Sequence, residues 1–308
     1  MEIYLPIAEQ SMNVFILLGL GAAAGLLAGM FGVGGGFLAT PLLIFVGIPP
    51  AVAVASQANQ VIANSVSSLQ VQWRRGNVDL RMGLVLLLGG MIGSSAGVSL
   101  FTYLKRIGQI DFVIAVLYVV MLSSIGLLML AESLRTYLRR RRNPEAPRGK
   151  LHTHYLVHRL PLKLRFYKSK LYISALLPLG LGFIIGILSA ILGVGGGFVL
   201  VPAMIYLLGM PTSVVIGTSN FQILFVAANV TFLQAATNGT VDVVLALLLI
   251  LGGVVGAPVG SRLAAKLPGV ALRGLMAVLI LAVAAELLTE LLQTPSSIYS
   301  LSTREVLP

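Results

Sequence analysis

Residues 31–37 read FGVGGGF, and residues 192–198, which lie 161 positions further on, read LGVGGGF. A proline follows each run at the same distance, at Pro41 and Pro202. Glycine inside a helix costs about 1 kcal/mol relative to alanine. Three glycines in succession therefore mark a place where the chain leaves helical geometry or where another backbone approaches closely.

On both sides of these runs, the two halves of the chain repeat one another. The matching positions are GLG at 19–21 and 180–182, Pro50 and Pro211, Asn59 and Asn220, and, at an offset of 163, GNVD at 76–79 and GTVD at 239–242. This register places two inserted residues in a loop of the second copy. Colinear glycines, prolines and polar residues favour a duplication over chance similarity between apolar segments.

The composition indicates whether the chain folds in water or in a membrane. Of the 308 residues, 57% are hydrophobic and 10% are charged, whereas a soluble domain has about 25% charged residues. We therefore predict an integral membrane protein. Each half divides into five apolar segments, approximately 14–31, 36–47, 52–73, 80–101 and 110–134, then 172–192, 197–208, 212–234, 243–262 and 270–292.

The second segment of each half is shorter than the roughly 20 residues that a membrane span needs. The pair of segments around each glycine run is thus either a long crossing plus a short one, or a re-entrant hairpin. Either arrangement adds an even number of crossings and leaves an odd total per half, so the halves are expected to be inverted. The predicted fold class is an all-α integral membrane protein of two inverted five-segment repeats, with broken or re-entrant helices at the glycine-rich motifs.

Basic residues give the expected orientation. The formal net charge is +11, and 12 of the 21 Lys and Arg lie between Arg135 and Lys170. Cytoplasmic loops carry an excess of such residues. We therefore expect a first transmembrane repeat at 1–134, a basic cytoplasmic linker at 135–170 and a second repeat at 171–308.

Inverted halves place the loop at 73–81 inside and its counterpart at 234–242 outside. The first contains three Arg and the second none, as expected, whereas Lys105 and Arg106 oppose this arrangement. Both termini are expected outside a multi-pass protein of the cell inner membrane, and the start of the chain does not have the form of a cleavable signal.

The glycine runs and the polar third segments are the candidate anion site. The first turn of a helix offers unpaired N–H groups and the positive end of the helix dipole. Two such turns facing one another would bind an anion without a formal charge. The predicted substrate-binding residues are Gly34, Gly35, Gly36, Phe37, Gln57, Asn59, Gly195, Gly196, Gly197, Phe198, Thr218, Ser219 and Asn220. The alternative is close helix packing through small residues, with polar side chains bonding neighbouring helices.

Several chemistries are not supported by the sequence. No charged residue or His falls deep in the segments, which disfavours a protein-borne proton relay and a hydrolase. A nucleotide-binding loop is disfavoured because no Lys-Ser/Thr follows either run. His152, His154 and His158 lack Cys or acidic partners for a metal. We expect no enzyme activity, no cofactor, no metal and no nucleic acid, and we expect membrane lipid with anionic headgroups as a partner of the linker. The oligomeric state stays open.

The paired GxGGG runs, each followed by a proline, resemble those of the TauE/SafE family of sulfite and organosulfonate exporters. The resemblance covers nearly the whole chain except the linker and the tails. It implies a secondary transporter (exporter) of small sulfur oxyanions across the bacterial inner membrane by alternating access, with one half rocking against the other. The alternatives are an anion channel, or a non-transporting membrane scaffold or sensor that acts through the basic linker.

Overall fold

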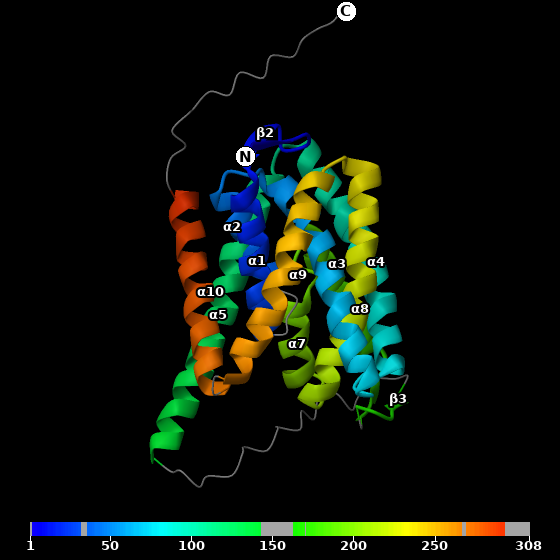
Figure 1. The fold of residues 1–308 in the computed structure, drawn as a ribbon. Helices are drawn as coiled ribbons and strands as arrows, with labels where there is room; N and C mark the ends of the chain where they lie inside the picture. The colour runs from blue at the N-terminus through cyan, green and yellow to red at the C-terminus, as the bar shows by residue number, and fades with distance from the viewer. Residues whose placement is uncertain (1, 32–35, 143–162, 170, 267–268, 293–308) are drawn as a thin grey trace, which may run out of the picture.

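The computed structural model describes residues 2–31, 36–142, 163–169, 171–266 and 269–292. These residues form a bundle of roughly parallel helices with a β-hairpin at each end (Figure 1). In chain order the elements are β1 (Glu2–Leu5), β2 (Gln10–Asn13), α1 (Val14–Phe31), α2 (Gly36–Phe45), α3 (Pro50–Arg74), α4 (Leu80–Arg106), α5 (Ile110–Arg142), β3 (Lys163–Phe166), β4 (Leu171–Ser174), α6 (Leu176–Leu192), α7 (Gly197–Tyr206), α8 (Thr212–Leu233), the π-helical turn η2 (Gln234–Asn238), α9 (Val243–Lys266) and α10 (Gly269–Leu292).

The ten helices coincide in order with the ten predicted apolar segments, and the all-α fold class is confirmed for the described residues. Helices α4, α5, α8 with η2, α9 and α10 include stretches long and apolar enough to cross a membrane. Helices α2 and α7 have ten residues each. Each therefore rises about 15 Å, or half of the roughly 30 Å hydrocarbon layer. The two hairpins, β1–β2 and β3–β4, were not predicted.

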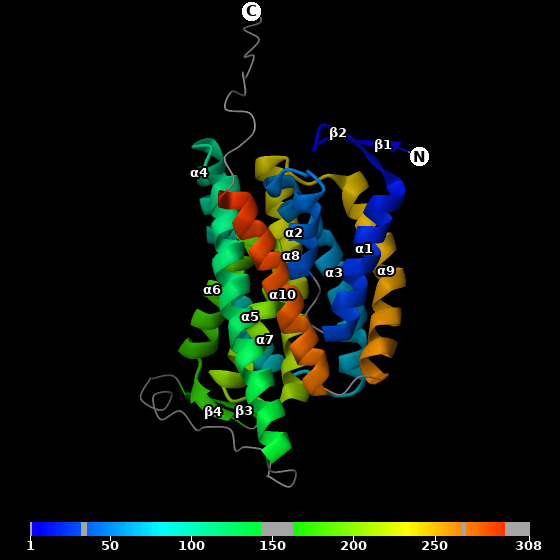
Figure 2. The same ribbon diagram turned by 90° about the vertical axis from the view of Figure 1, so that its left-hand side faces the viewer.

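Helices α1 and α2 form a hairpin that returns to the end of the molecule where it began. The Gln10 amide nitrogen, on the strand before α1, donates to the carbonyl oxygen of Gly47, in the turn after α2, at 2.7 Å. Helices α6 and α7 begin and end at the opposite end of the bundle, beside β3–β4 (Figures 1 and 2). Neither short helix therefore continues to the far end of the molecule.

Close helix packing joins the first half of the chain to the second. Helix α1 lies along α9, where a methyl group added at Gly256 would lie 2.0 Å from the carbonyl oxygen of Ala22. One added at Gly25 would lie 2.4 Å from the oxygen of Gly253. Only residues without a Cβ allow two backbones to approach this closely. These glycines thus fix α1 of the first half against α9 of the second.

Helices α4 and α6 pack in the same way. An added methyl group at Gly93 would lie 2.0 Å from the carbonyl oxygen of Phe183, and one at Gly186 would lie 2.4 Å from that of Gly90. Helices α3 and α8 also contact each other, as do α5 and α10. The two halves are therefore interleaved through the bundle and do not form two separate bodies.

Two buried aspartates attach the hairpins to the bundle. Asp79 caps α4 by accepting from the N–H of Met82, and its other carboxylate oxygen accepts from Ser169 N–H at 2.9 Å and Ser169 Oγ at 2.6 Å. Asp242 accepts in the same way from Leu245 N–H in α9 and from Ile7 N–H in the β1–β2 turn. Each hairpin is thus held by the first residue before a long helix of the other half.

Contacts across the bundle correct the predicted alignment of the two sequence repeats at α3 and α8. Asp79 N–H donates to Thr218 Oγ1 at 3.1 Å, and Asp242 N–H donates to Ser56 Oγ at 2.9 Å. The repeat equivalent of Thr218 is therefore Ser56, at an offset of 162. The predicted offset of 161, which matches Gln57 with Thr218 and Asn59 with Asn220, was wrong by one residue here. Pro49 and Pro211, which precede α3 and α8, agree with this offset.

The two inserted residues consequently lie at two places. One falls in the turn between α7 and α8, because Ile48 N–H bonds back to Leu43 whereas Met210 N–H bonds back to Met204, one residue further. The other is accommodated by η2, since a π-helical turn holds one more residue than an α-helical turn.

The predicted linker at 135–170 contains regular structure at both of its ends. Helix α5 continues to Arg142, and β3 begins at Lys163. Residues 143–162, with His152, His154 and His158, lie outside the described residues.

Candidate functional site

The described part of the first glycine motif, Gly36 and Phe37, lies against the second motif. Gly34 and Gly35 lie outside the described residues. Gly36 is the first residue of α2. In the second motif Gly195 and Gly196 have φ angles of +69° and +74°, which side-chain-bearing residues rarely adopt, and Gly197 begins α7. The glycines thus turn the chain from the end of α6 into a new helix.

The first turns of α2 and α7 face one another. Phe37 and Phe198 stack with ring centroids 4.4 Å apart and planes 8° apart, and their side chains are 1% and 2% exposed. Each phenylalanine is the second residue of its helix. The stacked rings thus bring the first turns of α2 and α7 into contact.

Side chains of α3 and α8 fill the space beside the motif glycines. A methyl group added at Gly36 would lie 2.7 Å from Cγ2 of Val61 and 3.2 Å from the Cα of Val194. One added at Gly195 would lie 2.4 Å from Cγ1 of Val61 and 2.9 Å from Cγ2 of Ile223. Val61 thus contacts both motifs, and any side chain at either glycine would displace it.

Gln57 lies one helical turn before Val61 and belongs to a hydrogen-bond network whose direction is fixed. The Gln60 amide nitrogen donates to the carbonyl oxygens of Gly21 and Leu249 at 3.0 and 2.9 Å. The Gln60 oxygen then accepts from the Gln57 amide nitrogen at 2.8 Å. The Gln57 oxygen Oε1 is left buried and has no partner among the described residues. Gln57 therefore offers a buried, unpartnered acceptor to a ligand.

The other predicted side chains are committed to bonds within the protein. Asn59 donates to Ser56 O at 3.3 Å, and Ser219 donates to Ile216 O at 3.1 Å. The Asn220 amide nitrogen donates to Ser68 Oγ at 2.9 Å and to Ile216 O at 2.7 Å. Thr218 accepts from Asp79 N–H, beside the β3–β4 hairpin. Of the predicted polar ligands, Gln57 alone has a buried atom without a partner in the described part of the chain.

The model of the family described as "Sulfite exporter TauE/SafE" matches residues 17–287. The chain belongs to the TauE/SafE sulfite exporter family. A "Probable membrane transporter protein YjnA" from Bacillus subtilis (strain 168) is 30% identical over 276 residues, which cover 88% of this chain and 97% of the relative. A "Probable membrane transporter protein" from Xylella fastidiosa (strain 9a5c) is 29% identical over 256 residues, covering 82% and 86%. No solved structure gives a significant match. This TauE/SafE protein is thus a multi-pass membrane transporter.

Two glutamines of this TauE/SafE protein were not predicted as site residues. Gln60 and Gln222 are fully buried and occupy equivalent positions at the offset of 162. Gln60 lies against Gly253 on α9, and Gln222 lies against Gly90 on α4. The signal in the sequence was a glutamine in each third segment, paired with a double glycine, at 89–90 and 252–253, in each fourth segment. The register error of one residue concealed this pairing.

The two glutamines differ in their hydrogen bonds. Gln60 bonds two carbonyl oxygens, whereas both polar atoms of the Gln222 amide have no partner among the described residues. An unpaired buried polar group costs about 1–3 kcal/mol. The two equivalent glutamines, one in each half of the chain, are therefore in different hydrogen-bonding states.

Proposed function

We propose that this TauE/SafE protein is a secondary transporter that exports small sulfur oxyanions, such as sulfite or organosulfonates, across the bacterial inner membrane by alternating access. The observation that carries the proposal is the stacked pair Phe37 and Phe198, which sets the first turns of α2 and α7 against one another. In this proposal the unpaired peptide N–H groups at the two helix starts are directed toward the same anion.

In this proposal the anion binds between Gly36–Phe37 and Gly195–Phe198. Helix N-termini bind oxyanions because their N–H groups are unpaired and the helix dipole is positive there. The glycines let the backbone approach the anion closely, since no Cβ intervenes. Residues 34 and 35 complete the first motif. Asn59, Thr218, Ser219 and Asn220 then act by holding α3 and α8 in place.

Gln57 has a distinct role in this site. Its free Oε1 accepts a hydrogen bond, so it favours an anion that carries a proton over a fully ionised one. Hydrogensulfite is such an anion, and sulfate at neutral pH is not. We therefore propose that Gln57 discriminates between oxyanions by their protonation, without any titratable group of the protein.

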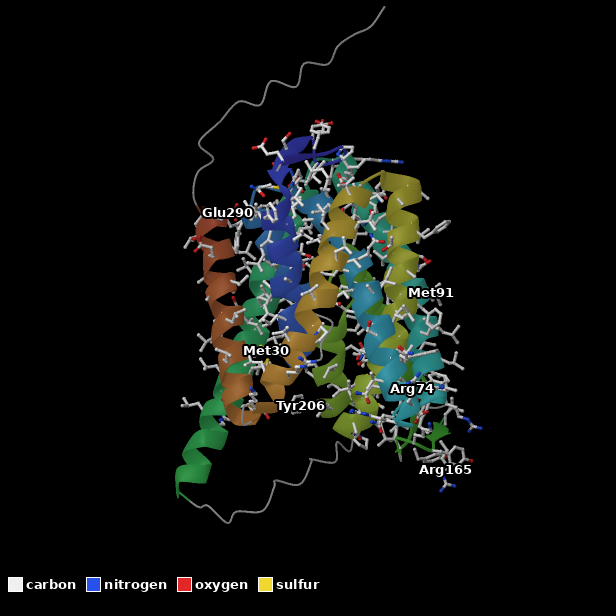
Figure 3. The ribbon with its side chains drawn as sticks, viewed as in Figure 1. Met30, Arg74, Met91, Arg165, Tyr206 and Glu290 are labelled. Carbon is white, nitrogen blue, oxygen red and sulfur yellow. The ribbon has the colours of Figure 1, made fainter. Side chains whose placement is uncertain are left out.

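The membrane orientation follows from charge. One end of the bundle has the β3–β4 hairpin and a set of bases that includes Arg74 and Arg165, and the other has the β1–β2 hairpin and acids that include Glu290 (Figure 3). By the positive-inside rule the basic end and the linker are cytoplasmic, and both termini are outside. Lys105 is a base at the outer end, where its Nζ donates a hydrogen bond to the carbonyl oxygen of Asn238 at 2.9 Å.

The β1–β2 and β3–β4 hairpins lie at opposite ends of the bundle, which supports two inverted repeats. The groups of helices that we expect to move together are, however, not the two repeats. Helix α1 is locked to α9 and α4 is locked to α6 by backbone contacts at glycines. Rocking one half of the chain against the other would separate both pairs. We propose that α1, α3 and α9 move as one unit and α4, α6 and α8 as the other, with the α3–α8 contact between them.

Gln60 and Gln222 support two alternating states. Gln60 bonds Gly21 and Leu249 across one unit, and the corresponding carbonyls around Gln222 are those of Gly182 and Leu86 in the other. In the opposite state we expect Gln222 to make these bonds and Gln60 to release its own.

The test is anion flux in proteoliposomes containing the purified protein, with sulfite, sulfate, thiosulfate, sulfoacetate and taurine, each with and without a pH gradient. The proposal predicts saturable sulfite flux that is stimulated by unlabelled sulfite on the opposite side. Linear flux without such counterflow would indicate an anion channel. Absence of flux for every anion would leave a scaffold or sensor acting through residues 135–170.

A further inference from the structure

The β3–β4 hairpin forms a hollow at the basic end of the molecule. Its volume is about 290 Å³, close to the lower limit of small-ligand pockets. Its lining residues are Arg165, Phe166, Tyr167, Leu171 and Tyr172. Ser169 in the hairpin turn is bonded to the buried Asp79, so the hollow is fixed to the start of α4.

Two guanidinium groups lie over the ring of Tyr167, which lines this hollow. Arg81, in the first turn of α4, lies 5.0 Å from the ring centroid of Tyr167, and Arg165, on β3, lies 5.7 Å from the same centroid. Two positive charges held at one ring attract an anion more strongly than a single charge does. Asp79, two residues before Arg81, already accepts hydrogen bonds from Ser169 and Met82. The arrangement therefore favours an anion that binds both guanidinium groups.

The equivalent hairpin at the other end shows that folding does not require these bases. In β1–β2 Glu2 pairs with Asn13, and in β3–β4 Lys163 pairs with Ser174 at the same register. At the same offset of 161, Tyr4 takes the place of Arg165. Both hairpins are held by an aspartate, yet only β3–β4 is basic. The bases thus serve a purpose beyond the hairpin itself.

The apolar surroundings indicate a lipid and not a soluble anion. Tyr167 and Tyr172 are 65% and 58% exposed, as is usual for aromatic side chains at the membrane interface. From Arg81 an exposed apolar row runs along the same face of α4 at i+3, i+7 and i+11, formed by Leu84, Leu88 and Ile92. Such a row is suited to an acyl chain that extends from a headgroup held at Arg81.

We propose that the β3–β4 hairpin and the start of α4 form a binding site for an anionic phospholipid. The lipid phosphate binds Arg81 and Arg165, the rest of its headgroup occupies the hollow at Tyr167 and Tyr172, and an acyl chain follows α4. This site is independent of the transported anion. It also joins the hairpin to the unit of α4, α6 and α8.

The test uses the full-length protein purified in detergent and titrated with phosphatidylglycerol or phosphatidylcholine, with bound lipid counted by native mass spectrometry. We expect R81Q/R165Q to weaken phosphatidylglycerol binding by about fivefold for each guanidinium removed, and to leave phosphatidylcholine binding unchanged. The matched control is R262Q/K266Q, which removes two bases at the same end of the molecule, on α9, away from the hairpin (Figure 1).

Three results would overturn the proposal. One is equal weakening in the control, which would mean diffuse attraction to the basic end. Another is unchanged phosphatidylglycerol binding in R81Q/R165Q. The third is displacement of the lipid by inorganic phosphate at a similar concentration, which would mean a soluble-anion site. If R81Q/R165Q fails to fold, R165Q alone gives the same comparison, because Arg165 is an exposed residue on β3.

Discussion

Gln60 and Gln222 are the same residue in equivalent surroundings, yet one amide is fully bonded and the other is not. Buried amides in lipid are stabilising when bonded and costly when unpaired. Their positions could have been found from the sequence, since both third segments contain a glutamine at the offset of 162. The difference in their hydrogen bonding could not have been predicted, because two identical residue types give no indication of which amide is bonded.

This difference predicts that leucine at position 60 and leucine at position 222 affect stability differently. Q60L removes three hydrogen bonds and leaves the Gln57 amide nitrogen without its Gln60 acceptor, so we expect it to lower stability by about 1–2 kcal/mol. Q222L replaces an unpaired amide and should be neutral or stabilising in this state. Thermal unfolding of the two purified variants in detergent measures the effect. Equal losses of stability would contradict the hydrogen-bond assignment.

Two substitutions of Gln57 test whether its free oxygen binds the anion. Q57E adds a carboxylate in place of the free acceptor, and its charge would repel an anion in the low-dielectric interior. We expect sulfite flux to fall at least tenfold, while Q57A, which removes the acceptor without adding charge, loses discrimination between sulfite and sulfate. Measuring the flux of each anion into proteoliposomes gives the ratio of sulfite to sulfate transport for each variant. Unaltered flux in both variants would place the anion elsewhere.

Among the elements, the glycine faces of α1, α4, α6 and α9 decide how the bundle assembles. Their spacing was visible in the sequence, but it was read as part of the repeat and not as contact between the halves. Periodicity indicates which residues share a face of a helix and not which helix lies opposite. The two β-hairpins were missed for a related reason, because each has only four-residue strands beside long apolar helices.

These contacts predict different effects of alanine at different glycines of the packed pairs α1–α9 and α4–α6. G256A and G93A place a methyl group 2.0 Å from a carbonyl oxygen, and such overpacking costs about 1–3 kcal/mol. G19A and G180A are the controls, because nothing lies within 4 Å of either position. We expect the controls to be neutral or slightly stabilising through helix propensity. Unfolding temperatures of the four variants test this, and loss of stability in the controls would contradict it.

For the molecule as a whole, the sequence predicted a membrane protein with ten helical segments, and the structure and the family agree. Hydropathy carries this information because lipid requires long apolar helices. The side-chain ligands were harder to predict. Asn59, Ser219 and Asn220 are polar residues on polar faces, yet they bond within their own helices or to α3. Polarity alone does not distinguish a ligand from such a contact.

The chain contains no cysteine, which allows a direct test of its orientation. Y4C and Y167C place single thiols in the two hairpins, at tyrosines that are 58% and 65% exposed. With a membrane-impermeant maleimide we expect Y4C to react in intact spheroplasts and Y167C to react only after lysis. Reaction of both thiols from the same side would contradict the inverted arrangement.

Passage of sulfite between the first turns of α2 and α7 is tested by counterflow of labelled sulfite in proteoliposomes. We expect saturable counterflow for the wild type and strongly reduced counterflow for G36A, whose new methyl group lies 2.7 Å from Val61. We expect recovery in G36A/V61A, where Val61 no longer obstructs that methyl group. The same counterflow in G36A as in the wild type, with both proteins folded, would contradict the site. Absence of counterflow in the wild type would contradict the transport of sulfite.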